Sequence, residues 1–218
     1  SAIGLIRMIL ENNKELRIRD LINYSCLLYN DQNLKFDTKK IQKELIEFLN
    51  DRLKNFMKEK NIRMDIIDSA TSSNNIDNII RIYRKSLVFN NLISKEIGSD
   101  VIYIYKRASS IIVNELKNKE LEISGSTDPA LFKNDFEKNL YKKINEIRKY
   151  FTVIHEQEDC ENSFETLASV KKEVTEFFDN VIVNDEDQSI KKNRLELLQM
   201  LCKTFDSYFN FSSIESAT

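Results

Sequence analysis

The sequence predicts an all-α fold, a helical bundle in which a smaller helical segment precedes a larger one. Its 218 residues include 3 glycines and 1 proline, against roughly 15 and 11 at average usage. Sheet proteins need such residues in their many turns, so this scarcity favours helices. Apolar residues make up 41% of the chain and recur at helical spacing almost throughout, which gives each helix a face to bury.

The first segment, residues 1–73, is predicted to contain amphipathic helices. In the longest of them, Leu45 and Leu49 lie on one face. The polar run TSSNN at residues 71–75 contains no apolar residue, so we place a domain boundary there, and residues 74–218 form the second segment. The predicted helices of the first segment cover residues 2–12, 16–30, 38–60 and 64–70.

The second segment is predicted to begin with helices whose ends are set by single residues. A helix, or a broken pair, is expected from Ile76 to about Ile97, where Gly98 supplies a C-terminal stop. Asp100 then caps a helix over about residues 101–118. A loop rich in serine follows.

An Asp-Pro pair marks the next predicted helix start. Asp128 is typical of an N-cap, and Pro129 is typical of the first helical position, where its missing N–H costs nothing. From Phe132 to Ile154, apolar residues recur at steps of three and four. We therefore expect one continuous helix with a seam of about six turns.

Two further helices are expected toward the C-terminus. Asn162 opens an N-S-F-E run ending at Glu165, the pattern of a capping box, and predicts a helix to about Asn180 or beyond. The acidic run DED at residues 185–187 precedes the last helix, where negative charge is favourable against the helix dipole.

Few side chains suit catalysis or metal binding. The one histidine, His155, has no Cys or His partner nearby, which favours a surface or capping role over metal ligation. No signature of a catalytic triad surrounds it. The DED run lacks the spacing of a calcium loop, and the sequence has no Gly-rich phosphate-binding motif. We therefore expect no metal site, no cofactor and no bond-making chemistry in this chain.

Cysteine and charge patterns indicate the setting and the kind of partner. Cys26, Cys160 and Cys202 are odd in number and far apart, which is typical of a reduced, cytoplasmic chain. No apolar run approaches the roughly 18 residues of a membrane helix, so no membrane contact is expected. Residues 1–98 carry 17 Lys and Arg against 13 Asp and Glu, whereas residues 99–218 carry 16 against 22. RNA contact would therefore come from local clusters of cations.

Seven short stretches follow one another in a fixed order across nearly the whole chain. They are EFLNDRL at 47–53, YKRASSI at 105–111, DPALFKNDFEKNLY at 128–141, LASVK at 167–171, FFDNVIVNDED at 177–187, IKKNRLELL at 190–198 and NFS at 210–212. In this order they resemble the pattern of one known family, the bacterial glycyl-tRNA synthetase β subunit, although each alone is short. The chain departs from that pattern at Asn61, where glycine is common, and at Asn184, where an apolar residue is usual.

The resemblance implies the C-terminal region of that β subunit, with a DALR-type anticodon-binding bundle in the second segment. The first segment is then the end of an upstream HD-type or linker region. The chain opens inside a predicted helix and is expected to be a piece of a longer polypeptide. The family implies a cytoplasmic bacterial α2β2 enzyme, a glycine–tRNA ligase. Its α subunit carries the active site and charges tRNA-Gly with the use of ATP and Mg²⁺, while the β bundle holds the anticodon end.

RNA binding needs cations for phosphates and amide or aromatic groups for bases. Local clusters in the second segment meet this need, and the start of the last helix also offers backbone N–H groups to phosphate. The candidates are Lys106 and Arg107; Lys142, Lys143, Arg148 and Lys149; and Lys191, Lys192, Asn193 and Arg194.

Alternatives remain open for these residues and for the bundle. The second cluster is equally typical of a solvated helix face, and Arg194 is placed to pair with Asp179 or Glu176 inside the bundle. The acidic balance of residues 99–218 favours a subunit-docking bundle that never touches RNA. An HD-type phosphohydrolase is excluded, because that chemistry needs several histidine ligands and the chain has one.

Overall fold

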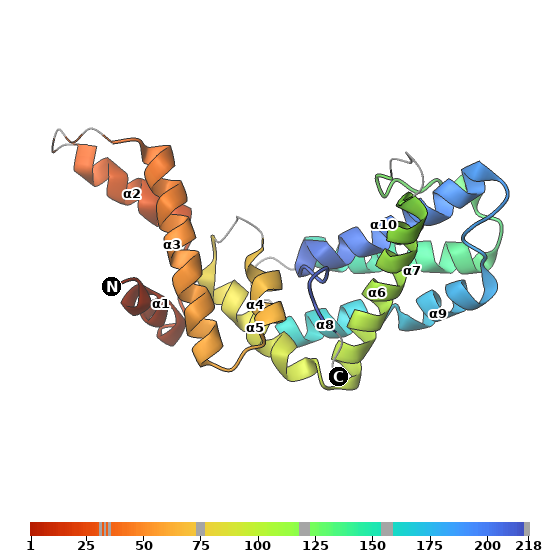
Figure 1. Ribbon diagram of the computed structural model, residues 1–218, viewed down its shortest axis with the longest axis horizontal. Coiled ribbons are helices and arrows are strands. Elements are labelled where there is room, and N and C mark those ends of the chain that lie inside the picture. The colour runs from red at the N-terminus through yellow and green to blue at the C-terminus, as the bar shows by residue number, and fades with distance from the viewer. Residues whose placement is uncertain are drawn as a thin grey trace. The chain divides into compact units, whose positions relative to one another are not determined.

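The structure, a computed structural model, describes residues 1–30, 32, 34, 36–72, 77–117, 123–153 and 159–215 (Figure 1). Every regular element within these ranges is a helix, which confirms the predicted all-α fold. The chain divides into two compact units, Ser1–Asn90 and Asn91–Thr218. The boundary predicted between residues 73 and 74 and the role predicted for His155 lie outside the described residues and stay predictions.

The first unit is built around its longest helix, α3. Its helices are α1 (Ala2–Glu11), α2 (Ile18–Asn30), α3 (Thr38–Glu59), α4 (Met64–Thr71) and α5 (Ile79–Leu92), which continues into the second unit. α3 packs against α1, α2 and α4, and these four agree with their predicted spans to within two residues. The Asp37 carboxylate starts α3 by accepting hydrogen bonds from the backbone N–H groups of Lys39 and Lys40 at 3.0 and 3.2 Å, which a helix otherwise leaves unpaired.

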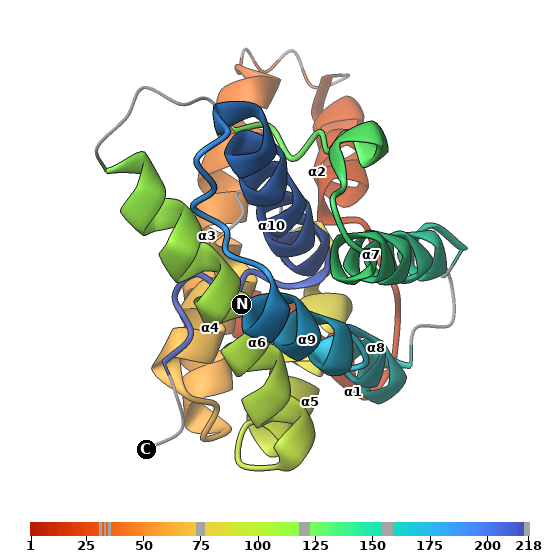
Figure 2. The same ribbon diagram turned by 90° about the vertical axis from the view of Figure 1, so that its right-hand side faces the viewer.

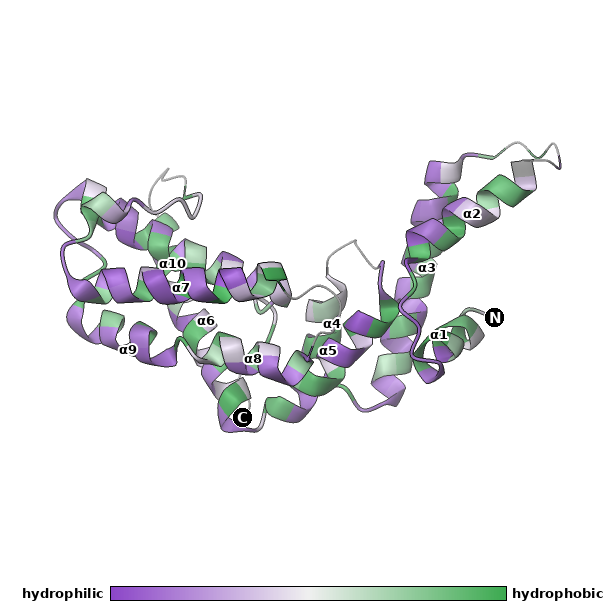
Figure 3. Ribbon diagram, turned by 180° about the vertical axis from the view of Figure 1, so that it is seen from behind, coloured by the Kyte–Doolittle hydropathy of each residue, from purple (hydrophilic) through white to green (hydrophobic). Residues whose placement is uncertain are grey.

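An apolar groove lies open in the first unit. Figure 3 shows apolar stretches along α2, where Leu27 and Leu28 are 62% and 57% exposed. The groove has a volume of about 630 Å³, and its lining includes Leu21, Leu45 and Phe48. Exposed apolar surface of this kind is typical of a packing or docking face.

The second unit places its last helix between two others. Its elements are α6 (Glu96–Leu116), the 3₁₀ turn η1 (Pro129–Leu131), α7 (Asp135–Val153), α8 (Cys160–Ala168), α9 (Lys171–Asn180) and α10 (Gln188–Tyr208). α10 packs against both α6 and α7 (Figure 2), α6 also packs against α8, and α7 packs against α9. The core between them is aromatic, since Phe164, Phe177, Phe205 and Phe211 are at most 1% exposed.

Gly98 does not end a helix, and the predicted stop was wrong. α6 begins at Glu96 with Lys95 as its N-cap, so Gly98 lies in the first turn and Asp100 is not the cap. The reason for glycine is close packing. A Cβ on Gly98 would overlap the carbonyl of Leu92 and lie 2.6 Å from the Cα of Ile93, so only a residue without a side chain lets α6 follow α5 this tightly.

The Asp-Pro pair starts a 3₁₀ turn, and α7 has a cap of its own. As predicted, Asp128 is an N-cap, and its Oδ1 accepts from the Ala130 N–H at 2.9 Å. After η1, the Asn134 side chain accepts from the Glu137 N–H at 3.0 Å, while the Glu137 carboxylate accepts from the Asn134 N–H at 3.1 Å. This reciprocal capping box interrupts the seam from Phe132, so the single continuous helix was wrong.

The capping box predicted at Asn162 is also displaced. Asp159 caps α8 and accepts from the Asn162 N–H itself at 3.2 Å, inside the first turn. The single helix expected to follow is broken into α8 and α9 around the fully buried Val170. The last predicted start is confirmed, since Asp187 accepts from the Ser189 N–H at 2.8 Å at the head of α10.

Candidate nucleic-acid interface

Arg194, in the first turns of α10, forms internal ion pairs. Its side chain is 6% exposed. The Nε atom donates to Glu137 Oε1 at 2.6 Å, and Nη1 donates to Asp185 Oδ2 at 2.6 Å and to the Ile182 carbonyl at 2.8 Å. Glu137 is itself 1% exposed. A buried charge needs this complete pairing, and the pairing leaves almost no surface of Arg194 for a ligand.

Two residues beside this arginine are internal as well. Asn193 is 5% exposed; its Oδ1 accepts from the Asp128 N–H at 2.7 Å and its Nδ2 donates to the Asp128 carbonyl at 2.9 Å. Lys191 is 3% exposed and pairs with Glu115 of α6 at 2.5 Å. These contacts tie the start of α10 to α6 and to the Asp-Pro turn, so two of the stretches that carry the family resemblance are bonded to each other.

Of the four candidates at the start of α10, Lys192 alone is exposed. The side chains of the other three are buried, so they are not accessible for the RNA contacts that were predicted for them. Arg194 forms ion pairs inside the bundle, as the alternative interpretation of this residue expected. Its partners are Glu137 and Asp185, whereas Asp179 or Glu176 had been expected. The acceptor on α7 lies 57 residues away in sequence, and no local pattern pointed to it.

The carboxyl of Asp185 is held ionised in the turn before α10. The backbone N–H of Asp187 donates to its Oδ1 at 3.0 Å, and the Arg194 guanidinium donates to its other oxygen. The hydrogen bond from the Asp187 backbone N–H has the larger effect and the one from Arg194 the next largest. Both hold the pKa of the Asp185 carboxyl below its usual value. The acidic run is thus a structural turn that orients Arg194.

Arg107 forms an exposed cluster with two aromatic rings. Its guanidinium carbon lies 4.7 Å from the ring centroid of Phe178 on α9 and 5.8 Å from that of Tyr103 on α6. Tyr103 is 41% exposed, and Lys106 lies beside the cluster, half-buried. An aromatic ring attracts a cation placed over its face. The two rings therefore hold the guanidinium of Arg107 in place at the surface. We call Tyr103, Arg107 and Phe178 the guanidinium–aromatic cluster.

The predicted cations of α7 lie apart from this cluster in the fold. Lys142 and Lys149 are exposed, and Lys143 lies 3.9 Å from Glu146 one turn along the helix. Arg107 is carried by α6, which packs on α8, α9 and α10, whereas these lysines are carried by α7, which packs on α9 and α10. These predicted cations therefore belong to two different helices of the second unit.

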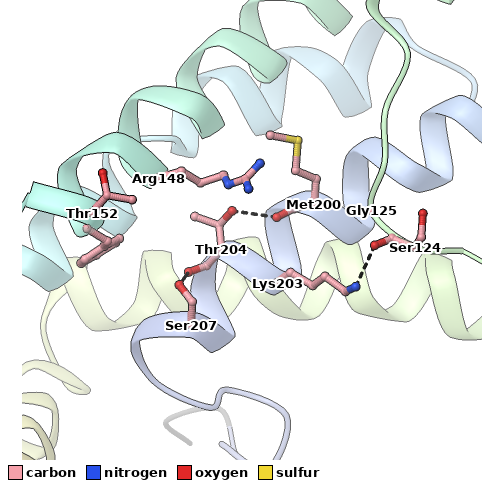
Figure 4. Close-up of a pocket in the computed structure, with 9 residues that line it drawn as sticks. Ser124, Gly125, Arg148, Thr152, Met200, Lys203, Thr204 and Ser207 are labelled. Atoms are coloured by element: carbon pink, nitrogen blue, oxygen red, sulfur yellow. Dashed lines mark hydrogen bonds between the residues drawn. The ribbon is translucent and has the colours of Figure 1, made fainter.

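A pocket between α7 and α10 does bring two cations together (Figure 4). It has a volume of about 550 Å³, and Arg148 of α7 and Lys203 of α10 both line it. Arg148 was predicted within the α7 cluster, whereas Lys203 was missed because a single lysine late in an amphipathic helix carries no signal. The other lining residues are Ser124, Gly125, Phe151, Thr152, Met200, Thr204 and Ser207.

One wall of the pocket is a loop wrapped around a buried carboxylate. Glu196 of α10 is 5% exposed and accepts from the backbone N–H groups of Ser124 at 3.1 Å, of Gly125 and of Ser126 at 3.0 Å. Gly125 has a φ of +78°, a conformation that favours glycine. The loop is held on α10, and Glu196 is fully used by it.

Among the residues that the structure describes, no group of three or more His, Cys, Asp or Glu side chains suits a metal ion. The helices among these residues include none that is both long and apolar enough to cross a membrane.

Comparison with known proteins assigns this geometry to a family. Residues 101–216, which run from within α6 to beyond the end of α10, match the DALR anticodon binding domain. The chain belongs to the DALR anticodon-binding family. Residues 1–72 match a second family, described as glycyl-tRNA synthetase beta subunit. The DALR match covers the guanidinium–aromatic cluster and all the described residues that line the α7–α10 pocket.

Curated relatives extend the likeness of this DALR-family chain over nearly its whole length. A glycine–tRNA ligase beta subunit of Rickettsia prowazekii (strain Madrid E) is 32% identical over 211 residues, 96% of the chain. One of Rickettsia africae (strain ESF-5) is 33% identical over 213 residues, 98% of the chain. The chain spans 29% and 30% of the length of these relatives. The predicted resemblance to the glycyl-tRNA synthetase β subunit is confirmed.

Proposed function

We propose that the second unit binds the anticodon end of tRNA-Gly as part of the β subunit of a glycine–tRNA ligase. The DALR match over residues 101–216 supports this, as do the names of the relatives. The observation that carries it is the guanidinium–aromatic cluster, with Arg107 exposed against two rings. Single-stranded RNA is recognised by stacking on aromatic and guanidinium planes, with cations on its phosphates.

In the intact enzyme this binding supports the charging of tRNA-Gly. The α subunit of an α2β2 assembly performs that reaction with ATP and Mg²⁺ in the bacterial cytoplasm. The chain itself supplies cations and rings that hold the RNA, and Lys106, Lys142, Lys143 and Lys192 are its further phosphate contacts.

Anisotropy with labelled tRNA-Gly and an unrelated tRNA, across a salt series, tests the proposal. Arg107→Ala is expected to weaken binding of tRNA-Gly about tenfold, because stacking on such a cluster contributes roughly 1–3 kcal/mol. Arg107→Lys keeps the charge but loses the planar guanidinium, so it should recover the salt dependence and only part of the affinity.

Lys138→Ala on α7 is the matched control, since it removes one cation that is 58% exposed and that pairs, among the described residues, with its helix neighbour Asp135. This variant should bind as the parent does. If the parent chain binds neither tRNA, or if Arg107→Ala leaves the affinity for tRNA-Gly unchanged, the proposal fails.

A second candidate is a subunit-docking bundle that does not contact RNA. The excess of acidic residues in positions 99–218, 22 against 16 basic ones, favours it. It predicts no binding of tRNA at any salt concentration, so the same titration separates the two candidates.

A further inference from the structure

We propose that the pocket between α7 and α10 binds a backbone phosphate of a single-stranded tRNA segment, through Arg148 and Lys203. This inference rests on the proposed tRNA-binding function and adds to it a second contact site, which shares no residue with the guanidinium–aromatic cluster. The pocket is large enough, at about 550 Å³, to take a nucleotide as well as its phosphate.

The two cations reach the pocket from different helices. Arg148 projects from α7 across the pocket, and Lys203 extends from α10 toward the loop at Ser124 (Figure 4). The Lys203 ammonium donates to the Ser124 carbonyl at 2.7 Å, which positions it and leaves two of its three N–H groups for a ligand. Arg148 makes no hydrogen bond or ion pair with any residue that the structure describes, so its guanidinium is available.

Among the residues that the structure describes, no carboxylate lines the pocket beside these cations, since none of the described lining residues is Asp or Glu. On the loop side, the carboxylate of Glu196 is occupied by the backbone N–H groups of Ser124, Gly125 and Ser126. A guanidinium and an ammonium that share a concave site favour an anion, and a guanidinium matches the two free oxygens of a phosphodiester.

The remaining polar groups of the pocket are acceptors. The hydroxyls of Thr204, Ser207 and Thr152 donate to backbone carbonyls of their own helices, at 2.8, 2.7 and 2.7 Å. Their lone pairs are therefore what they offer to a ligand. Beside them, Phe151 and Met200 supply apolar surface. Cations, acceptors and apolar surface in one pocket suit an unstacked nucleotide, whose base has donors and an apolar face.

Gly125 gives the loop beside this site its backbone conformation. A Cβ on Gly125 would lie 3.4 Å from Lys203 Cδ and 3.4 Å from the Met200 nitrogen, at a backbone φ of +78°. These distances are ordinary van der Waals contacts, so the strain of a substitution would come from the positive φ. Glycine thus lets the loop adopt the conformation in which the Ser124 carbonyl accepts from the ammonium.

The test is anisotropy of labelled tRNA-Gly with the 218-residue chain and two variants, Arg148→Ala and Lys203→Gln. Each is expected to lower the affinity about tenfold, as loss of a charged hydrogen bond does. Each should also reduce the slope of log K against log salt by about 0.7, the value for one contact on a single strand. Arg148→Lys should restore the slope. Lys172→Ala on α9, which removes an exposed cation paired with Glu176, should change neither.

The outcomes separate this inference from the proposed function. If Arg107→Ala weakens binding and both pocket variants bind with parental affinity and slope, the pocket assignment is overturned while tRNA binding stands. If the parent chain does not bind tRNA-Gly, both fail. Circular dichroism of each variant shows whether a loss reflects unfolding, and Arg148, which is exposed, is the variant expected to fold like the parent.

A free nucleotide could present the same phosphate chemistry, so one arm identifies the source. Adenosine monophosphate is titrated while the side-chain Nε–H resonance of Arg148 is followed by NMR. Saturation at micromolar concentration, together with unchanged affinity of Arg148→Ala for tRNA-Gly, would assign the pocket to a free nucleotide. That result would overturn the proposal that the pocket binds a tRNA phosphate. No saturation below millimolar concentration, with weakened tRNA binding in the variant, supports the backbone phosphate.

Discussion

At the scale of single residues, burial decides what a cation does. Lys191, Asn193 and Arg194 lie in a polar run that resembles an RNA-binding helix start, yet all three are at most 6% exposed. Each is used to hold another part of the second unit. Lys192, in the same run, is exposed. A helical pattern gives the face of a residue, but it does not show whether a second helix supplies a carboxylate to that face.

Arg194→Ala is expected to destabilise the chain by about 3–5 kcal/mol, because it leaves Glu137 buried without its partner. Urea unfolding followed by circular dichroism measures the change. The control is Lys192→Ala, an exposed neighbour whose effect should stay within about 0.5 kcal/mol. A loss below about 1 kcal/mol for Arg194→Ala would mean that the buried pair is not formed in solution.

Asp185→Asn is expected to change the pH dependence of stability. The folded pKa of Asp185 lies below its ordinary value, so its stabilisation is present above the unfolded pKa of about 3.9 and is lost as the pH falls through the folded pKa. The parent should therefore be more stable than the variant at pH 7, and the gap should close on acidification. Free energies of unfolding between pH 7 and pH 3 measure this.

Glu186→Gln is the matched control for that series, since it removes the exposed carboxylate that adjoins Asp185 in sequence. The stability of this variant should follow the parental curve. A gap between parent and Asp185→Asn that stays constant from pH 7 to pH 3 would contradict the assigned role of the carboxyl.

At the scale of the elements, short polar caps set where helices begin. Asp128 was predicted as a cap, and the acidic run at residues 185–187, which contains the cap Asp187, was predicted to mark the start of the last helix. The caps of α7 and α8 were missed, because the Asn-x-x-Glu box at residues 134–137 and Asp159 each compete with an equally plausible start nearby. At Gly98 a helix end was predicted where the structure has none. A glycine between two helical patterns is typical of a C-terminal stop, whereas Gly98 lies in the first turn of α6 and permits close packing.

Gly98→Ala is expected to destabilise the second unit by about 1–3 kcal/mol, the usual cost of overpacking, since its Cβ would overlap the Leu92 carbonyl. Thermal unfolding of the variant measures the loss. Gly4→Ala is the control, because the nearest atom to its Cβ is the Ser1 hydroxyl at 3.5 Å, and it should be neutral or slightly stabilising as alanine favours helices. Equal effects of the two substitutions would contradict the packing role.

At the scale of the whole molecule, the net charge of a segment does not show where its exposed cations lie. In residues 99–218 two acidic residues, Glu137 and Glu196, are buried, and so are two basic ones, Lys191 and Arg194. These four residues therefore leave the acidic excess of the segment unchanged. RNA contact depends on local clusters of exposed cations, and Arg107 and Arg148 lie at the surface of this unit.

The sequence by itself determined the fold class, most of the helices, the absence of Gly-rich motifs and the family, because these depend on local spacing and on short ordered motifs. Only the tertiary structure decided which cations are free. Arg194 meets Glu137 from 57 residues away, and Lys203 joins Arg148 in one pocket from a different helix. Such pairings depend on how the helices pack, and packing is set by residues throughout the unit. No single stretch of the sequence therefore predicts them.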